Sequence, residues 1–470
     1  MKRKGILVTC IVSLLALLSV PLTMDILYFS LPTVYGKTLY GAMKGKLDLI
    51  KESKGKKIVV IGGSSVPFSL DSSLIKEYLP AYTPIDFGLY ASLGTNLMLD
   101  LASPYIGKED IVIVSPEISS QTLSLYYDGL ATHKALEQNK DMVWSLDGRM
   151  KEALLGAVPS FVGEKINYLR STLPEPKDIY AASSFNSYGD IVVEREGNIM
   201  LDGVDDNHPI TLDEGIIADD FLAKLNDFSK NCSDKGAKCY YRFSPMNDAS
   251  IVKKDHLQSF YSRLESGLCF PILGDPYQAI LEKEWFYDTN YHLNSAGAHN
   301  WTKQFIKDIK LTLDDASPTP IVEAAKPPLI NPGQHKDGDN SFADYFAYEE
   351  NGDEATVVSL TKQAERIVIP YRHNGKLITS FASSLFAGNQ MVKEIVIQDN
   401  IRLLHDRSFA GSAISKIYLD NDVPSSIGVG DILLEGSNAA IYVHKENLTA
   451  YKTSYAWAKY AKDIHEWKKS

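Results

Sequence analysis

The chain has 470 residues, of which 44% are hydrophobic, 23% charged and 10% aromatic; this composition fits two or three globular domains and excludes collagen-like, wholly disordered and multi-span membrane proteins. The formal net charge of -11 argues against a nucleic-acid binder, which would carry a basic face, and four cysteines are too few for a disulfide-dense scaffold. Residues 1–57 sum to +7, residues 58–340 to -16 and residues 341–470 to -2, which indicates three regions with different roles.

The N-terminal segment has the pattern of a membrane anchor. A basic start at residues 2–4 precedes residues 5–24, which contain no charged residue. Twenty helical residues rising about 1.5 Å each just span a hydrocarbon core of about 30 Å. We therefore predict a single signal anchor or transmembrane helix over residues 1–31 and a membrane-proximal segment over 32–56, with the bulk of the chain outside the cell membrane. A buried core helix is the alternative, and later cleavage of the segment stays open.

The following region alternates short apolar runs with helical patterns. The runs predicted as strands are Ile58–Ile61, Ile85–Phe87, Ile111–Ser115 and Cys239–Phe243. The predicted helices are Leu74–Leu79, Leu93–Ala102, Ile216–Lys230, Ile251–Leu268 and Gly297–Leu311. Short all-apolar strands separated by helices indicate a three-layer α/β domain, in which helices cover both faces of a parallel sheet. Functional groups gather at the carboxyl ends of such strands, so the loops after the first three strands are the expected place for a site.

The first of these loops carries a candidate nucleophile. Ser64 follows Gly62 and Gly63 directly after the first predicted strand. A serine at a tight turn between a strand and a helix exposes its hydroxyl beside free backbone N–H groups, and the glycines let a substrate approach closely. A turn of this composition is also common as a plain connection. Ser65 is the alternative nucleophile.

The second half of a serine catalyst lies just before the last predicted helix. A serine hydroxyl needs a base, and an imidazole needs a carboxylate that holds its tautomer. His292 can be the base, and Asp288, four residues earlier, can orient it. The alternative is a surface turn in which Asn294 or Ser295 caps the helix.

Together, the two segments resemble the SGNH (GDSL-like) hydrolase superfamily, whose nucleophile follows the first strand in a Gly-x-Ser turn and whose D-x-x-H-L motif precedes the last helix. The matching residues are 62–64 and 288–293, and the resemblance covers residues 57–312. The chain is more similar to the exported branch that includes DltD-like and alginate O-acetyltransferase-like proteins, because of residues 64–71 and 287–294 and the predicted anchor.

The resemblance implies acyl transfer by a triad of Ser64, His292 and Asp288 without a cofactor. An outward-facing domain meets polysaccharide or peptidoglycan, so we expect an O-acyl, most simply O-acetyl, esterase or transferase, with a membrane acyl-donor protein as a further partner. Hydrolysis and transfer are not distinguished by these residues. The alternative is a surface adhesion or scaffold protein that has lost activity. The histidines and cysteines lack metal-site spacing, so no metal is expected.

The resemblance also implies an oxyanion hole, with one departure from the family. The N–H groups of Ser64 and Gly88 would receive the oxyanion. The family's third block, Gly-x-Asn-Asp, is replaced by residues 115–117, which lack the Asn donor, and Asn186 is the candidate substitute. Glu117 is a candidate substrate-binding residue or a plain helix-start carboxylate.

Export makes a disulfide feasible in this domain. Cys232 and Cys239 flank a polar loop and are the predicted pair, which would leave Cys269 as the odd thiol in a strand over 270–273. Reduced core cysteines are an alternative of equal weight.

The C-terminal region repeats a short pattern. Residues 313–345 contain several prolines and few apolar runs, which indicates an exposed linker. Predicted strands then recur at spacings of 28, 22 and 24 residues: Ile367–Ile369, Ile395–Ile397, Ile417–Leu419 and Ile441–Val443. Such a period is typical of leucine-rich repeats, and the pattern resembles the BspA-type repeats of bacterial surface proteins. We therefore predict a short leucine-rich-repeat solenoid over residues 346–470 that binds glycan or protein; an irregular β-rich domain is the alternative.

Overall fold

The described part of the chain begins within the predicted anchor, at residue 23. The computed structural model describes residues 23–24, 26–170, 179–321, 327, 329, 338–351, 354–422, 424, 427–430, 432–453 and 457–468. Most of the predicted anchor, residues 1–31, therefore lies outside the described residues, as does much of the predicted linker. Within the described residues, no helix is both long enough and apolar enough to cross a membrane.

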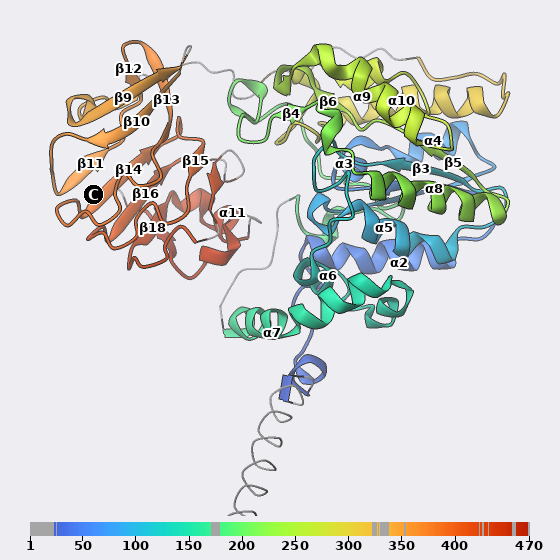
Figure 1. Cartoon of the computed structure of the whole chain (residues 1–470), viewed down its shortest axis with the longest axis horizontal. Coiled ribbons are helices and arrows are strands. Elements are labelled where there is room, and N and C mark those ends of the chain that lie inside the picture. Colours follow the sequence, from blue (N-terminus) through green and yellow to red (C-terminus); the bar gives the residue numbers. More distant parts are fainter. Residues whose placement is uncertain are drawn as a thin grey trace, which may run out of the picture.

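A four-stranded parallel sheet in the order β2-β1-β3-β5 forms the centre of the first domain (Figure 1). Its strands are β1 (Lys57–Gly62), β2 (Thr83–Gly88), β3 (Ile111–Ser115) and β5 (Lys238–Tyr241). All four were predicted, because each is a short run of buried apolar residues. Gly62 is in register with both Gly88 and Ser115. The loops after these three strands therefore meet at one edge of the sheet.

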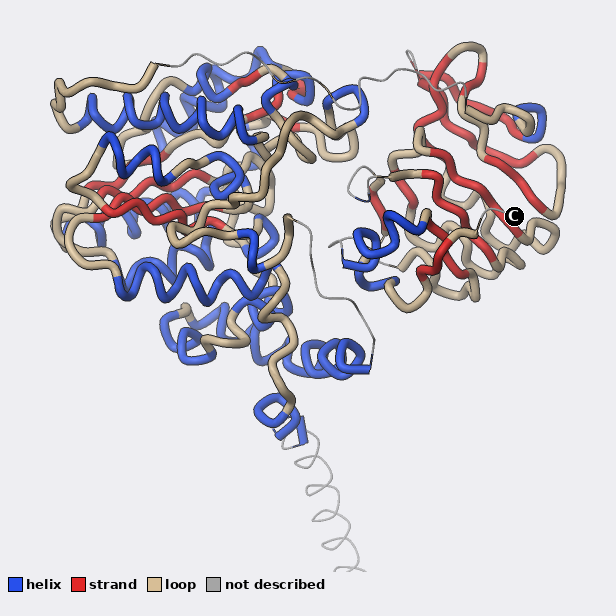
Figure 2. The backbone as a smooth tube through the Cα atoms, turned by 180° about the vertical axis from the view of Figure 1, so that it is seen from behind, coloured by secondary structure: helices blue, strands red, loops and turns tan. Residues whose placement is uncertain are grey.

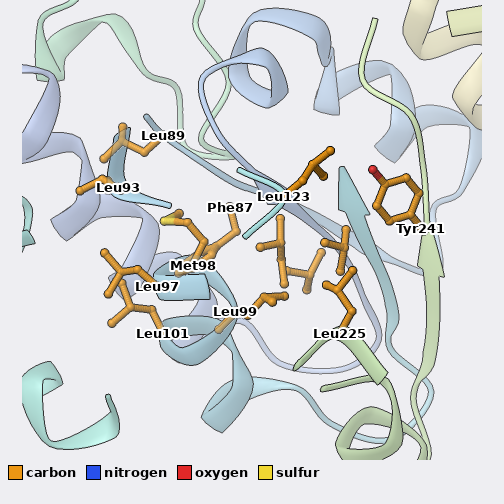
Figure 3. Close-up of a cluster of buried hydrophobic side chains, with 14 of the residues drawn as sticks. Phe87, Leu89, Leu93, Leu97, Met98, Leu99, Leu101, Leu123, Leu225 and Tyr241 are labelled. Carbon is orange, nitrogen blue, oxygen red and sulfur yellow. The ribbon is translucent and has the colours of Figure 1, made fainter. Parts of the chain in front are cut away.

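Helices cover both faces of this sheet (Figures 1 and 2). One face carries α3 (Ser65–Ser69), α4 (Ser72–Tyr78) and α10 (Ser295–Thr312), and the other carries α2 (Ala42–Glu52), α5 (Thr95–Ala102) and α8 (Asp219–Asp234). Successive strand residues point to opposite faces. Ile58 and Val60 accordingly join the core with Phe305 of α10. Val59 and Ile61 join the larger core, part of which is drawn in Figure 3. The predicted α/β class is confirmed.

The remaining elements of this domain lie at its ends. They are α6 (Gly129–Ala135), α7 (Gly148–Arg170), α9 (Leu257–Gly267) and the short parallel pairs β4 (Ile210–Thr211) with β7 (Ile251–Val252) and β6 (Met246–Asn247) with β8 (Ile280–Leu281). Helices α6 and α7 lie at the end where the N-terminal segment enters the domain, whereas α9 lies at the far end (Figure 1).

The C-terminal part contains two further sheets, in the orders β12-β13-β10-β9 and β11-β14-β16-β18-β19, and a short pair of β15 with β17. The elements are β9 (Phe346–Asn351), β10 (Glu354–Leu360), β11 (Arg366–Val368), β12 (Arg372–His373), β13 (Lys376–Phe381), β14 (Glu394–Gln398), β15 (Leu403–Leu404), β16 (Lys416–Asp420), β17 (Gly428–Val429), β18 (Ala440–Val443), α11 (Leu448–Thr453) and β19 (Ile464–Glu466).

The five-stranded sheet is parallel and regularly spaced along the chain. One buried isoleucine per strand lies in register across it: Ile367, Ile395, Ile417, Ile441 and Ile464. The connecting turns also repeat, since Phe386 stacks on Phe409 with ring centroids 6.0 Å apart. The Gly388 N–H donates to Ala410 O of the next turn. The four predicted strands are confirmed, and the assignment to leucine-rich repeats stays a prediction.

Candidate active site

Ser64 stands between β1 and α3, at the carboxyl edge of the sheet. Two glycines before it allow this turn to pack closely on the neighbouring strand. A Cβ atom at Gly62 would lie 2.3 Å from Ser115 O, and one at Gly63 would lie 2.3 Å from Glu117 Oε2. The Ser64 side chain is half-buried, which leaves its hydroxyl within reach of a ligand.

The structure brings the three predicted catalytic residues together. Ser64 Oγ lies 2.8 Å from His292 Nε2, and His292 Nδ1 lies 2.8 Å from Asp288 Oδ1. His292 and Asp288 are buried, whereas Ser64 is not. The interval between Asp288 and His292 is one residue longer than in the D-x-x-H motif, yet the carboxylate still reaches the outer ring nitrogen. This arrangement lets an imidazole accept the serine proton while a carboxylate stabilises the imidazolium.

The loop that carries Asp288 and His292 is held at several points. The Asn290 side chain donates to Asp205 O at 2.7 Å and to His208 O at 2.9 Å. The His292 N–H donates to Thr289 Oγ1 at 3.1 Å. Asn294 caps α10 by accepting from the Gly297 N–H at 2.9 Å, the capping role named above as the alternative to a catalytic loop. Here both occur, because the capped helix fixes the end of the loop.

An aromatic stack fixes the plane of the His292 ring. Phe68, in α3, lies parallel to this ring with centroids 3.8 Å apart and an angle of 9°. The Arg195 guanidinium covers the Phe68 ring at 5.2 Å. Arg195 is itself buried and donates to the carbonyls of Leu293 and Val193. Burial lowers the pKa of Arg195, and the nearby Asp288 carboxylate opposes this shift.

Tyr180 completes the environment of the carboxylate. Its hydroxyl donates to Asp288 Oδ2 and lies 3.4 Å from His292 Nδ1. Tyr180 could not be predicted from the sequence, because it lies in no periodic segment and is 108 positions from Asp288. A motif search has no local signal for such a contact.

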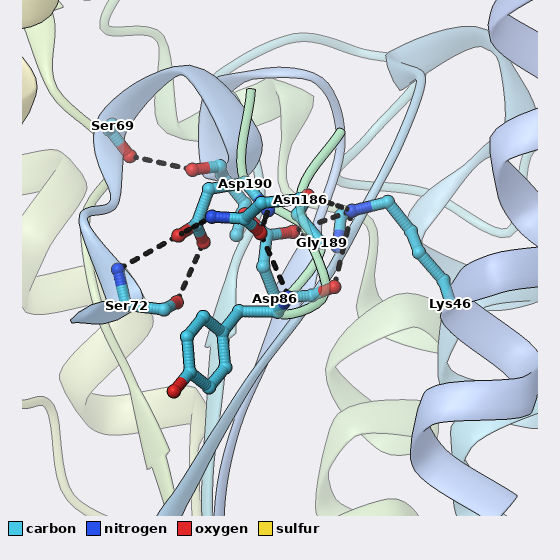
Figure 4. A network of polar contacts seen from close by, with 10 residues as sticks. Lys46, Ser69, Ser72, Asp86, Asn186, Gly189 and Asp190 are labelled. Carbon is cyan, nitrogen blue, oxygen red and sulfur yellow. Dashed lines mark hydrogen bonds and ion pairs between the residues drawn. The ribbon is translucent and has the colours of Figure 1, made fainter. Parts of the chain in front are cut away.

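The predicted oxyanion donors Gly88 and Asn186 have other hydrogen-bond partners in this structure. The Gly88 N–H donates to Asp86 Oδ1 at 3.0 Å, inside the sheet edge. Asn186 closes a turn, since its Oδ1 accepts from the Tyr188 N–H at 2.8 Å and its Nδ2 donates to Asp190 Oδ2 at 3.1 Å. Gly88 and Asn186 therefore donate to Asp86 and Asp190, two carboxylates of the buried polar network drawn in Figure 4. The Ser64 N–H remains as a donor, with no acceptor in the described part of the chain.

That network joins α2 to the carboxyl end of β2 (Figure 4). Lys46 Nζ lies 2.9 Å from Asp86 Oδ1 and donates to Gly189 O at 2.6 Å. Asp190 accepts from the Ser72 N–H at 2.8 Å. Burial raises the pKa of Asp86 to about 7 against the opposing effect of Lys46, and burial lowers the pKa of Lys46. No pattern in the sequence predicts a role for this lysine.

Glu117 was predicted either to bind substrate or to start a helix, and the structure places it in the interior. Its carboxylate is buried beneath the nucleophile turn, and Oε1 accepts the Ser65 N–H at 2.8 Å. Glu117 is not at the start of a helix. Ser65, the alternative nucleophile, is fully buried, and its Oγ faces Ser244 Oγ at 3.2 Å. Glu117 and Ser65 thus support the turn that presents Ser64.

The predicted disulfide between Cys232 and Cys239 is not formed. Both are buried free thiols, in α8 and β5. They contact each other through a hydrogen bond that, with burial, raises the pKa of Cys239. Their thiols are already satisfied within the core, so the fold does not require the bond. Cys269 is exposed rather than buried, and the strand expected after it is only a bridge between Ile272 and Tyr241.

The described residues contain no group of three or more His, Cys, Asp or Glu side chains that could hold a metal ion. A comparison of the sequence with protein-family models and with curated proteins finds no match to either.

Proposed function

We propose that this protein is a serine-dependent O-acyl esterase or acyltransferase of the SGNH-like kind. The observation that carries the proposal is the relay from Ser64 Oγ through both nitrogens of His292 to Asp288 Oδ1, with 2.8 Å at each contact. The relay sits at the carboxyl end of a parallel sheet, where α/β proteins place their ligands. The stacked Phe68 supports it further, since that ring restricts His292 to one orientation.

The reaction proceeds through an acyl-enzyme. Ser64 Oγ attacks the ester carbonyl while His292 Nε2 takes the hydroxyl proton. The tetrahedral intermediate collapses, the bond to the alkoxy group breaks, and His292 returns the proton to the departing alcohol. Water or a sugar hydroxyl then attacks the acyl group on Ser64 by the same steps in reverse. The Ser64 N–H is the one oxyanion donor that we assign.

A neutral glycan ester is the substrate class that we favour. Residues 58–340 sum to a charge of -16, which disfavours polyanions through like-charge repulsion. If residues 5–24 anchor the chain with its bulk outside the cell membrane, the site meets polysaccharide or peptidoglycan. A membrane acyl-donor protein would supply acyl groups in the transferase case.

The C-terminal part is proposed as a leucine-rich-repeat module of BspA type that binds glycan or protein. Support comes from its parallel strands, whose isoleucines at 367, 395, 417, 441 and 464 are in register. The stacked turn residues Phe386 and Phe409 add to it. Each unit buries its apolar face only against its neighbours, which is how repeat modules gain stability.

A catalytically inactive surface adhesion or scaffold protein is the second candidate. The observation that favours it is the engagement of Gly88 and Asn186 with Asp86 and Asp190, which leaves two expected oxyanion donors occupied. Loss of one such donor in a serine protease lowers kcat by about 10²–10³. A protein that has kept its fold and its repeats but not its activity would show this pattern.

Hydrolysis of p-nitrophenyl acetate by the detergent-solubilised full chain distinguishes the two candidates. We expect Ser64→Ala to lower kcat/KM by about 10³-fold or more, because the nucleophile is removed. Ser65→Ala should retain most of the activity, and Ser262→Ala, on the exposed face of α9, is the matched control. Equal rates for wild type and Ser64→Ala would reject the enzyme and leave the scaffold candidate.

A further inference from the structure

Four large apolar side chains are exposed at the end of the first domain where the N-terminal segment enters. Trp144 is 81% exposed, Leu155 74%, Phe29 71% and Ile26 56%. Single exposed apolar residues are common on protein surfaces, but a group of them calls for a partner. We call these residues, with the exposed face of α7, the proximal surface.

Direct contacts show that the proximal surface is continuous. Lys140 Nζ lies 5.1 Å from the centre of the Phe29 ring and donates to Tyr28 O. Lys140 also begins the short 3₁₀ helix that contains Trp144. Lys151 Nζ donates to Trp144 O at 3.1 Å. Leu155 follows Lys151 by four residues in α7 and so lies on the same side of that helix.

The middle of α7 lacks the charges that a solvent-facing helix normally carries, although Arg149, Glu152 and Arg170 are exposed nearer its ends. Residues 153–163 contain no charged residue. The residues of this stretch that are exposed at helical spacing are Leu155, Gly156, Pro159, Ser160 and Gly163. The inward face of α7 packs on the core in the usual way, since Phe161 is buried against His133 and Tyr28 with ring centroids 5.0 and 5.6 Å away.

A lipid bilayer is the occupant that fits this surface. Residues 5–24 carry no charge and lead through Asp25 directly into Ile26 and Phe29, so the chain leaves the domain at the proximal surface. An exposed tryptophan beside lysines is the pattern of residues that sit in the headgroup region, where an apolar body is buried and a polar group stays hydrated. Lys140 and Lys151 lie within this group.

We propose that the proximal surface rests in the headgroup layer of the membrane and orients the first domain on it. The inference rests on the proposed membrane location, but not on the proposed activity. Figure 1 shows α7 and the entering segment at one end of the domain and α3, which follows Ser64, well away from it. Orientation on the bilayer would direct Ser64 away from lipid, toward a polymer outside the membrane.

The test uses the full chain in vesicles of neutral phospholipid, with an NBD fluorophore on Leu155→Cys. Cys10→Ser and Cys269→Ser remove the other reactive thiols, because Cys232 and Cys239 are buried. The matched control carries the label on Tyr277→Cys, an exposed aromatic position beside α9 at the far end of the domain. Unchanged p-nitrophenyl acetate hydrolysis, or an unchanged unfolding temperature, verifies folding.

We expect doxyl-labelled lipid to quench the label at 155 at least twofold more than the label at 277, and aqueous iodide to show the opposite order. Equal iodide quenching at both positions, in vesicles that float with the protein, would contradict the proposed contact between the proximal surface and the membrane. It would leave the predicted N-terminal anchor unaffected. Protein that fails to float with the vesicles would contradict both. Protection of residue 155 only when a second membrane protein is added would replace lipid by a protein partner. Loss of the Ser64 dependence of hydrolysis would contradict the proposed activity alone.

Discussion

The side chain of His292 is surrounded by groups that can each be changed singly. Asp288 binds the Nδ1 atom of His292, Phe68 stacks on the ring, and Ser64 Oγ lies beside the Nε2 atom. Tyr180 binds the second oxygen of Asp288. These contacts leave the imidazole one orientation, so effects of substitution should fall on catalysis before they fall on binding.

Tyr180→Phe tests whether the hydrogen bond to Asp288 helps to hold His292 in the orientation needed for catalysis. The change removes a hydrogen bond to a carboxylate, which typically contributes about 1.5 kcal/mol or more. We expect kcat for p-nitrophenyl acetate to fall about tenfold, while KM changes less than about twofold. Tyr277→Phe, at an exposed hydroxyl, is the control. An unchanged kcat would show that Tyr180 does not position Asp288.

Glu117 is predicted to act through the nucleophile turn rather than through a substrate. Glu117→Ala leaves the Ser65 N–H buried and unpaired, which should cost about 1–3 kcal/mol of the free energy of unfolding. Glu117→Gln keeps a carbonyl oxygen as acceptor and should recover most of this loss. Thermal unfolding of both variants measures the effect. A raised KM without loss of stability in Glu117→Ala would instead restore the substrate-binding hypothesis.

At the scale of elements, the Lys46–Asp86 pair joins helix α2 to strand β2 and makes stability depend on pH. The pKa of Asp86 is raised to about 7 in the fold, against about 3.9 in an unfolded chain. The folded state therefore binds an extra proton between about pH 4 and pH 7, and this carboxyl makes the protein less stable as the pH rises through that window.

Asp86→Asn should remove this slope. Denaturant unfolding at several pH values between about 4 and 7 measures it, with Asp48→Asn, on the solvent-facing side of α2, as the control. The same pH slope in wild type and Asp86→Asn would contradict the assignment.

Some elements could be predicted from the sequence and others could not, for physical reasons. Strands β1, β2, β3 and β5 each contain a short apolar run because both faces of the sheet are covered, and such runs can be recognised in the sequence. Helix α7 was missed because residues 153–163 carry no polar face and so lack the amphipathic pattern. Strands β9, β10 and β13 were missed because their alternation of buried and exposed residues is interrupted by bulges in the pairing of β10.

In the candidate site, too, some residues could be predicted from the sequence and others could not. Ser64, Asp288 and His292 could be predicted because a serine nucleophile needs an imidazole base and a carboxylate. Local context marked them too, since Ser64 directly follows a predicted strand and the other two directly precede a predicted helix. The direction of the Gly88 N–H depends on the neighbouring Asp86, and Tyr180 arrives from a distant loop. Contacts of this kind depend on the completed fold, so a local pattern cannot carry them.

At the scale of the whole molecule, the C-terminal part is connected to the loop that supports the candidate site. Arg402 forms ion pairs with Asp206, at 2.6 Å, and with Glu354. Asp206 is next to Asp205, whose backbone is bound by Asn290 in the segment between Asp288 and His292. Polar contacts therefore connect the C-terminal part to the loop that carries His292.

The central claim is that Ser64 is a nucleophile, and the most direct measurement is the detection of its acyl-enzyme. The full chain is mixed with p-nitrophenyl acetate, quenched in acid within the first turnover, digested and analysed by mass spectrometry. We predict one acetyl group on the peptide that contains Ser64. The corresponding peptide should carry no acetyl group in Ser64→Ala or, within the same time, in His292→Gln. Release of nitrophenol without acetylated Ser64, or equal release by Ser64→Ala, would contradict the account.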